Sequence, residues 1–187
     1  MRLIDTHSHL FLEEFSEDFP QVIERARAAG VTHIFMPNID STTIEAMLSA
    51  CSLYKGYCFP MIGLHPTSVN ANYEKELEIV ARELKFSKEY VAIGEIGMDL
   101  YWDKTYLKEQ QIVLDKQVNW ALEYDLPVVI HCRDAFDYIY KVLEPYKKTP
   151  LRGIFHSFTG TAEEATRVLE FSDFFIGING VVTFKKS

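Results

Sequence analysis

Short runs of β-branched and apolar residues alternate along this chain with segments of helical periodicity. In one such segment Ile44, Met47, Leu48 and Cys51 follow the i, i+3, i+4, i+7 spacing of a single helix face. One strand and one helix together take up about 30 residues, which is typical of parallel βα units. We expect strands at residues 2–6, 31–36, 58–63, 90–94, 127–131, 152–156 and 174–178.

Two architectures are built from such repeated units: an open doubly wound sheet and a closed eight-stranded barrel. No GxGxxG or GxxxxGK[ST] loop follows the first expected strand, which disfavours the nucleotide-binding forms of the open sheet. We therefore expect an α/β fold of the (β/α)8 TIM-barrel type, which normally needs about 250 residues. The chain has 187 residues and stops just after the seventh expected strand. The expectation is a single domain, 1–187, with the barrel truncated after that strand and the C-terminal βα portion missing.

Histidines and one glutamate lie at or just after the ends of the expected strands. In a parallel barrel these ends share one face, which is where such folds hold their active sites. Of the six histidines in the chain, only His33 lies in mid-strand, and we expect it to be structural. The first strand is followed by His7 and His9, the third by His65, the fourth ends at Glu95, and the fifth and sixth end at His131 and His156.

This set of residues suits divalent cations. His7 and His9 are two apart on an extended segment, so both rings point to the same side and offer nitrogen donors. Glu95 closes an apolar strand, where a carboxylate is costly without charged partners, and it could bridge two ions about 3.5–4 Å apart. Mixed nitrogen and oxygen donors favour zinc, manganese, cobalt or iron over an all-oxygen magnesium cage. We expect two divalent ions, with zinc, manganese, cobalt and magnesium left open, held by His7, His9, Glu95, His131 and His156.

Arg133 leaves the same strand end as His131, and its guanidinium fork could hold a phosphate through two hydrogen bonds. A salt bridge to Asp134 or Asp137 would explain the same arginine equally well. The sequence therefore predicts either a phosphate contact or a structural ion pair at this position.

Other side chains near these strand ends could contact a substrate. His65 could donate to a phosphate or to a leaving group. The loop expected after Glu95 contains Asp99, Tyr101 and Trp102, and its aromatic rings could stack on a base, although loop packing explains them as well. Cys132 should point away from His131 because neighbours on a strand alternate, so we expect it in the core.

The chain carries 19 basic and 27 acidic residues, a net charge of −8, which disfavours a wide basic surface for nucleic acid. Bound divalent ions would supply positive charge locally, so a small phosphate site is compatible with this net charge.

No apolar run is long enough to cross a membrane, and the first residues lack a secretory signal. Three cysteines without a CxxC pair indicate reduced thiols. We expect a cytoplasmic protein without a stable protein partner.

Five motifs stand in order along the chain: DTHSHL, GLHP, IGEIGMDLYW, VIHCRDA and GIFHSFTGT. They resemble the successive signature motifs of the TatD family of metal-dependent deoxyribonucleases, and the resemblance runs from residue 4 to the GINGVVTFK segment. It implies a barrel of the amidohydrolase superfamily. By motif, His7 and His9 would bind one metal, Glu95 would bridge, and His131 and His156 would bind the other. The family's strand-eight aspartate, which completes the first metal site, has no matching motif here.

The resemblance implies hydrolysis of DNA from the 3′ end. From the residues themselves we expect a metal-activated water, Glu95 and His65 as catalytic residues, and Arg133, His65 and Tyr101 as substrate contacts. Two alternatives stay open. The same scaffold could act on amides, lactones or phosphate esters, because a fold does not settle a substrate. The chain could also be an inactive truncated fragment that binds metal or a partner.

Overall fold

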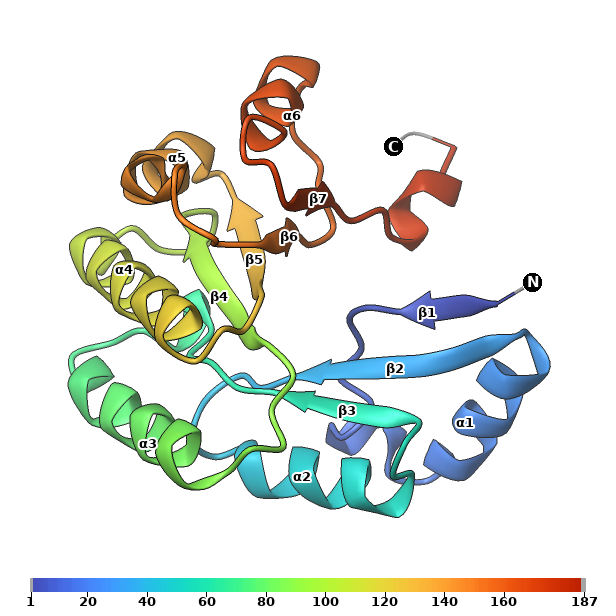
Figure 1. The fold of residues 1–187 in the computed structure, drawn as a ribbon. Coiled ribbons are helices and arrows are strands. Elements are labelled where there is room, and N and C mark those ends of the chain that lie inside the picture. Colours follow the sequence, from blue (N-terminus) through green and yellow to red (C-terminus); the bar gives the residue numbers. More distant parts are fainter. Residues whose placement is uncertain (1, 186–187) are drawn as a thin grey trace.

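The structure is a computed structural model that describes residues 2–185. Strands and helices alternate through this part of the chain, as expected (Figure 1). The strands are β1 (Leu3–Asp5), β2 (Val31–Pro37), β3 (Cys58–Met61), β4 (Ile93–Asp99), β5 (Val128–Arg133), β6 (Gly153–Phe155) and β7 (Phe174–Ile176). The α-helices are α1 (Phe19–Ala28), α2 (Ile44–Leu53), α3 (Tyr73–Phe86), α4 (Leu107–Glu123), α5 (Phe136–Leu143) and α6 (Ala162–Val168). Single 3-10 turns are η1 (Glu13–Phe15), η2 (Pro66–Ser68), η3 (Glu144–Tyr146) and η4 (Gly180–Thr183).

All strand pairs are parallel and form two sheets, ordered β1-β2-β3 and β4-β5-β6-β7. A bridge between Ile62 and Ile93 joins the sheets, and the Gly94 N–H donates to the Ile62 carbonyl at 2.9 Å. The helices cover the outside of the curved sheets (Figure 1). Within residues 2–185, β1 and β7 do not pair with each other, so hydrogen bonds do not close the barrel. The expected α/β barrel-type fold is confirmed in this open form.

The core lies between the sheets and their helices. All seven residues of β4 are buried, and so are Val128, Val129 and Ile130 of β5, as expected for parallel strands covered on both faces. From the helix side, Leu114 and Val118 of α4 are fully buried in the same cluster. Each such aliphatic side chain contributes about 1.5–3 kcal/mol relative to an exposed position. This packing holds β4 and β5, the strands that carry Glu95 and His131, in place.

The expected position of the fourth strand was wrong. It runs from Ile93 to Asp99 rather than over 90–94, so Glu95 lies inside the strand and not at its end. The segment IGEIGMD contains two glycines and two acidic residues, which disfavour a strand locally, but pairing with β5 and complete burial outweigh this preference. Likewise, β5 extends to Arg133, so His131 also lies within a strand, while β1 ends before His7 and His9.

An irregularity in β4 places the Glu95 backbone between the two sheets. The pairing of β4 with β5 shifts between Ile93 and Ile96, where Gly94 and Glu95 of β4 oppose the single residue Val129 of β5. Such a bulge bends a strand and redirects the side chains within it. The Glu95 N–H donates instead to the carbonyl of Asn38, just beyond β2, at 3.3 Å.

None of the helices in the described part of the chain is both long enough and apolar enough to cross a bilayer.

Candidate metal centre

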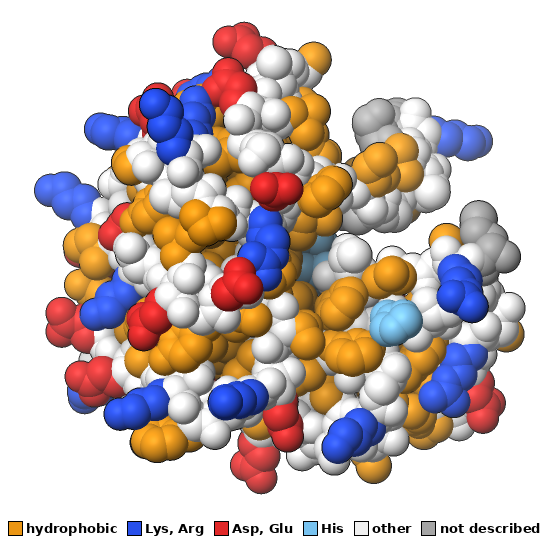
Figure 2. Space-filling view, in the orientation of Figure 1, with side chains coloured by type: hydrophobic (Ala, Val, Ile, Leu, Met, Phe, Trp, Pro, Cys, Tyr) orange, Lys and Arg blue, Asp and Glu red, His pale blue; other side chains and the backbone are white. Residues whose placement is uncertain are grey.

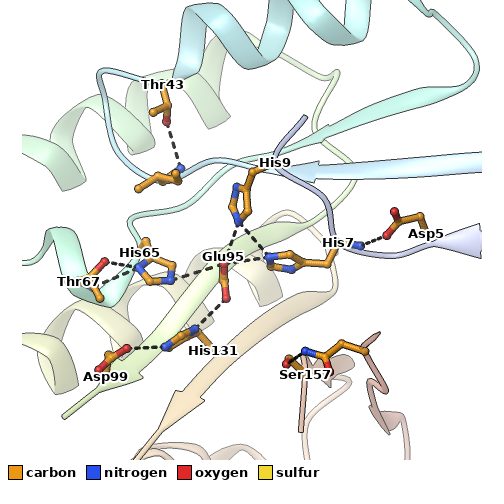
Figure 3. Close-up of polar contacts among 12 residues, drawn as sticks. Asp5, His7, His9, Thr43, His65, Thr67, Glu95, Asp99, His131 and Ser157 are labelled. Atoms are coloured by element: carbon orange, nitrogen blue, oxygen red, sulfur yellow. Dashed lines mark hydrogen bonds and ion pairs between the residues drawn. The ribbon is translucent and has the colours of Figure 1, made fainter. Parts of the chain in front are cut away.

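The buried carboxylate of Glu95 lies at the centre of four imidazoles (Figure 3). Its side chain is 3% exposed. Oε2 lies 3.0 Å from Nε2 of His7, 3.4 Å from Nε2 of His9 and 3.5 Å from Nε2 of His65. Oε1 lies 3.0 Å from Nδ1 of His131. Of the expected ligands, His7, His9 and His131 thus lie around Glu95, and His65 lies with them.

Local hydrogen bonds orient the histidines from the first sheet. The His7 N–H donates to Oδ1 of Asp5 at 3.1 Å, and the Ser8 N–H donates to the Phe35 carbonyl at 3.0 Å, which ties the loop after β1 to β2. Nδ1 of His65 contacts Oγ1 of Thr67 at 2.7 Å and accepts from the Thr67 N–H at 3.2 Å. With these contacts in place, Nε2 of both His7 and His65 faces Glu95 (Figure 3).

Two groups of donor atoms share Glu95. One consists of His7, His9 and Glu95, and the other of His65, Glu95 and His131, with the ligand atoms of each group within 4.8 Å of one another. A carboxylate common to two such groups is suited to bridge two ions. The groups differ from the expected set, because His65 takes the position beside His131 that the sequence assigned to His156.

His156 lies beside the first group instead. Its ring stacks on that of His7, with centroids 3.4 Å apart and planes at 12°. Burial and the neighbouring His7 lower the pKa of His156 to about 4. The ring is therefore neutral at pH 7 and keeps a lone pair for a ligand.

The residues fit a metal ion on their own geometry. The Nε2 atoms of His7 and His9 lie 3.1 Å apart and both face the carboxylate of Glu95. Nδ1 of each ring is buried and has no hydrogen-bond partner among residues 2–185. Unpartnered buried nitrogens are unfavourable in a purely structural cluster. Imidazole nitrogens and a carboxylate that converge in this way form a donor set typical of zinc or manganese.

The charges of the centre favour an ionised carboxylate. Burial by itself raises the pKa of Glu95, but hydrogen bonds from His131, His65, His7 and His9 outweigh it and hold the pKa well below its ordinary value. Burial lowers the pKa of His131, whereas Glu95 and Asp99 raise it, with a net increase. Glu95 is therefore negative across the physiological range and ready to accept a cation.

Asp99 takes part in the centre, although the sequence placed it in a loop. It ends β4, is 4% exposed, and its Oδ2 lies 2.9 Å from Nε2 of His131. The spacing of Asp99 from Glu95, four residues along an apolar segment, was the available signal. It was missed because the strand was expected to end at residue 94.

Arg133 stands beside the centre on the surface. Its guanidinium carbon lies 3.8 Å from the ring centroid of Tyr101 and 5.3 Å from that of Trp102. No ion pair in residues 2–185 joins Arg133 to Asp134 or Asp137, and Asp137 pairs with Arg167 at 2.7 Å. Of the two alternatives left open by the sequence, the structure therefore disfavours the ion pair with these aspartates.

A hollow of about 430 Å³ lies against the centre and is lined by His131, Arg133, His156, Ser157 and Thr159, among others. Figure 2 shows an opening between the segment after β7 and strand β1, with histidine surface at its floor. On this face Lys and Arg side chains are interspersed with Asp and Glu and form no continuous basic surface. This pattern fits a local anion site better than a wide nucleic-acid footprint.

The remaining expectations concern structural residues. Cys132 is half-buried rather than in the core: it packs against the main core cluster and also lines the hollow beside His131, and burial raises the pKa of its thiol to about 12. The ring of His33 stacks on Phe59 at 5.4 Å, away from the centre.

Comparison with known proteins gives a consistent result. The family described as TatD related DNase matches residues 4–187. The chain is 36% identical to the "Uncharacterized metal-dependent hydrolase YabD" of Bacillus subtilis, covering 99% of this chain and 71% of that protein. It is 33% identical to the "3'-5' ssDNA/RNA exonuclease TatD" of a Pantoea strain, covering 96% and 68%. The crystal structure of YjjV, a TatD homologue from Escherichia coli, superposes with a TM-score of 0.90 at 31% identity, covering 100% of this chain and 71% of that one. The match across nearly the whole chain, together with the donors around Glu95, shows that this protein is a metal-dependent hydrolase of the TatD family.

Proposed function

We propose that this protein is a phosphodiesterase that removes nucleotides from the 3′ end of single-stranded DNA with the help of two divalent ions. The observation that carries this proposal is the buried carboxylate of Glu95, shared by two groups of donors beside an exposed arginine. A relative at 33% identity bears the name 3'-5' ssDNA/RNA exonuclease, which supports the same reaction.

The ligands divide between the two sheets. His7 and His9 with Glu95 would hold one ion, and His131 with Glu95 the other, while His65 and His156 lie within reach of the centre. When bound, the ions supply Lewis-acid charge for the phosphate and lower the pKa of a water molecule to about 7. Glu95 keeps its negative charge in this role, because its hydrogen-bond partners hold its pKa low.

Substrate contacts come from the surface next to the centre. Arg133 presents its guanidinium towards the hollow that also contains His131, where it could hold a phosphate oxygen pair. Tyr101, 53% exposed, supports the guanidinium from one side and offers a ring edge to a base. We infer that His65, whose Nε2 faces Glu95, exchanges a proton near the reacting phosphate or serves as a ligand.

The test uses a 5′-labelled single-stranded oligodeoxynucleotide with added Mn²⁺. We expect a ladder of products shortened from the 3′ end, loss of this ladder with a chelator, and recovery when Mn²⁺ is returned. Glu95→Gln should reduce the rate at least about 100-fold, since it removes the bridging charge. Glu78→Gln, on the exposed side of α3, is the matched control and should cleave normally. Wild-type rates with chelator present or in Glu95→Gln would refute the proposal.

A second candidate is a hydrolase for another ester or amide, favoured by relatives that are named only as metal-dependent hydrolases. A panel of a phosphate diester, a phosphate triester, a lactone and an amide, measured against the oligonucleotide, separates the two. Higher kcat/KM on any of these small substrates than on DNA would select the second candidate.

We further propose that residues 1–187 act as one hydrolase domain, without a stable protein partner, and that the protein is cytoplasmic. Cys51, Cys58 and Cys132 are free thiols in the structure, which fits a reducing compartment. Fractionation of cells, with an antibody to this chain, tests the location.

A further inference from the structure

Asp99 connects the metal centre to the substrate-facing surface through its two carboxylate oxygens. Oδ2 lies 2.9 Å from Nε2 of His131, and Oδ1 accepts the Tyr101 N–H at 3.1 Å. On the opposite side of the His131 ring, Nδ1 faces Glu95 at 3.0 Å. The three side chains thus form the continuous row Asp99–His131–Glu95, visible in Figure 3.

The position of Asp99 is rigidly held. Its backbone N–H donates to Oε1 of Gln110 at 2.9 Å, and its carbonyl accepts from Nε2 of Gln110 at 3.2 Å. Both residues are 4% exposed. A buried carboxylate is unfavourable unless its oxygens are occupied, and here each oxygen has one protein donor. This is the geometry of a fixed acceptor and not of a flexible surface acid.

We propose that Asp99 is a positioning residue that fixes the ring tautomer of His131 for metal binding and anchors the loop that carries Tyr101. This assignment rests on the proposed role of His131 as a metal ligand. A neutral imidazole carries one ring proton, and which nitrogen holds it depends on the partner of that nitrogen. Because a carboxylate only accepts, Asp99 keeps a proton on Nε2, so that Nδ1, which faces Glu95, is the nitrogen that would give up its proton to a metal ion.

The second oxygen gives Asp99 a separate effect on the surface. Tyr101 supports Arg133, whose guanidinium carbon lies 3.8 Å from the ring centroid. Within residues 2–185, Asp99 is the one side chain that forms a hydrogen bond with the backbone of Tyr101. The orientation of the His131 ring and the position of Tyr101, on which Arg133 stacks, therefore both depend on the Asp99 side chain.

Asp99→Asn separates these contacts, because an amide has only one acceptor oxygen. If that oxygen takes the Tyr101 N–H, the amide NH₂ faces Nε2 of His131 and forces its proton onto Nδ1, where it blocks the ion. If the oxygen instead faces His131, the NH₂ opposes the Tyr101 N–H and displaces the loop. Asp103→Asn is the matched control, since Asp103 lies in the same loop, is exposed and accepts hydrogen bonds from the N–H and hydroxyl of Thr105, away from His131 and Tyr101.

The experiment measures Zn²⁺ binding by calorimetry with chelator competition, and the tautomer of His131 by ¹⁵N NMR of the ring at a pH where it is neutral. We expect Asp99→Asn to weaken one of two Zn²⁺ sites about 10–100-fold, the usual effect of losing such a partner. The site of His7 and His9 should change less, and Asp103→Asn should match wild type at both. In Asp99→Asn the His131 signals should also move towards the Nδ1–H form, because the carboxylate that holds the proton on Nε2 is lost.

Several results would overturn the assignment. Unchanged affinity at both sites together with an unchanged tautomer in folded Asp99→Asn would do so. If that variant does not fold by circular dichroism, Zn²⁺-loaded wild-type protein decides: a His131 bound through Nε2 contradicts the proposal, and one bound through Nδ1 supports it. Wild-type protein that binds no Zn²⁺ would reject the metal centre itself, and this assignment with it.

Discussion

At the residue scale, the chemistry of this protein depends on which nitrogen of each histidine is left free. His65 turns Nδ1 towards Thr67 and Nε2 towards Glu95, whereas His131 turns Nε2 towards Asp99 and Nδ1 towards Glu95. Residues with the same side chain thus present different atoms to the same carboxylate. Hydrogen-bond partners outside the cluster, and not the histidines themselves, set this choice.

The first residue-scale prediction concerns Arg133. Arg133→Lys should raise KM for a single-stranded oligonucleotide about tenfold and change kcat less, because lysine lacks the planar fork that stacks on Tyr101 and holds two phosphate oxygens. Steady-state kinetics with Mn²⁺ measure both constants. Arg152→Lys is the control, since Arg152 pairs with Asp125, away from the centre. An equal rise of KM in both variants would argue against a specific phosphate contact.

A second prediction at this scale follows from the buried thiols. Burial, with Cys58 nearby, raises the pKa of Cys51 from the ordinary 9.0 to about 12. At a pH between these two pKa values, the Cys51 thiol has lost its proton in the unfolded chain but keeps it in the folded protein. The free energy of unfolding must therefore fall as the pH rises above 9.0. The expected loss is about 1.4 kcal/mol per pH unit for each such thiol. Urea unfolding between about pH 8 and 10 measures it. Cys51→Ala should show a shallower decline, and an identical slope would contradict the assignment.

At the element scale, the contact between β4 and β5 decides the geometry of the centre. Gly97 pairs with His131 and has a φ of 140°, a conformation that residues with a Cβ rarely adopt. A Cβ at this position would overlap the backbone carbonyl of His131. Glycine therefore lets the strand that carries Glu95 approach the strand that carries His131.

Gly97→Ala is expected to lower the free energy of unfolding by about 3 kcal/mol, from backbone strain and overlap together. It should also weaken Zn²⁺ binding, because relief of the overlap moves His131. Denaturant unfolding and calorimetry give the two values. Gly56→Ala is the control: Gly56 also has a positive φ, of 80°, but nothing lies within 4 Å of a Cβ there. A similar loss of unfolding free energy in both variants would show that the strain of the positive φ, and not the close approach of β4 to β5, causes the effect.

At the scale of the whole molecule, the candidate metal centre joins the two sheets. His7, His9 and His65 follow strands of the first sheet, while Glu95 and His131 belong to the second. Within residues 2–185, the direct backbone connection between the sheets consists of the bridge of Ile62 with Ile93 and a few hydrogen bonds near it, among them that of Glu95 with Asn38. Ions held by residues from both sheets would therefore act as additional links between them.

We accordingly expect Zn²⁺ at about 100 times its Kd to stabilise the protein by about 2.7 kcal/mol and to raise Tm by roughly 5–10 °C. Differential scanning calorimetry with and without chelator measures the shift. In Glu95→Gln the shift should be much smaller, whereas Glu78→Gln should behave as wild type. An equal rise of Tm in Glu95→Gln would mean that Zn²⁺ binds elsewhere.

The sequence alone determined the alternation of strands and helices, because apolar periodicity follows directly from which faces are buried. It also determined the metal-binding chemistry, since the order of the strands in a parallel fold brings their ends together and places His7, His9 and His131 near Glu95. Only the tertiary structure showed that β4 extends to Asp99, because a segment with two glycines and two acids becomes a strand through pairing and burial, which are non-local. The same holds for the place of His65 in the second donor group and of His156 on the ring of His7: ring orientation depends on partners distant in sequence.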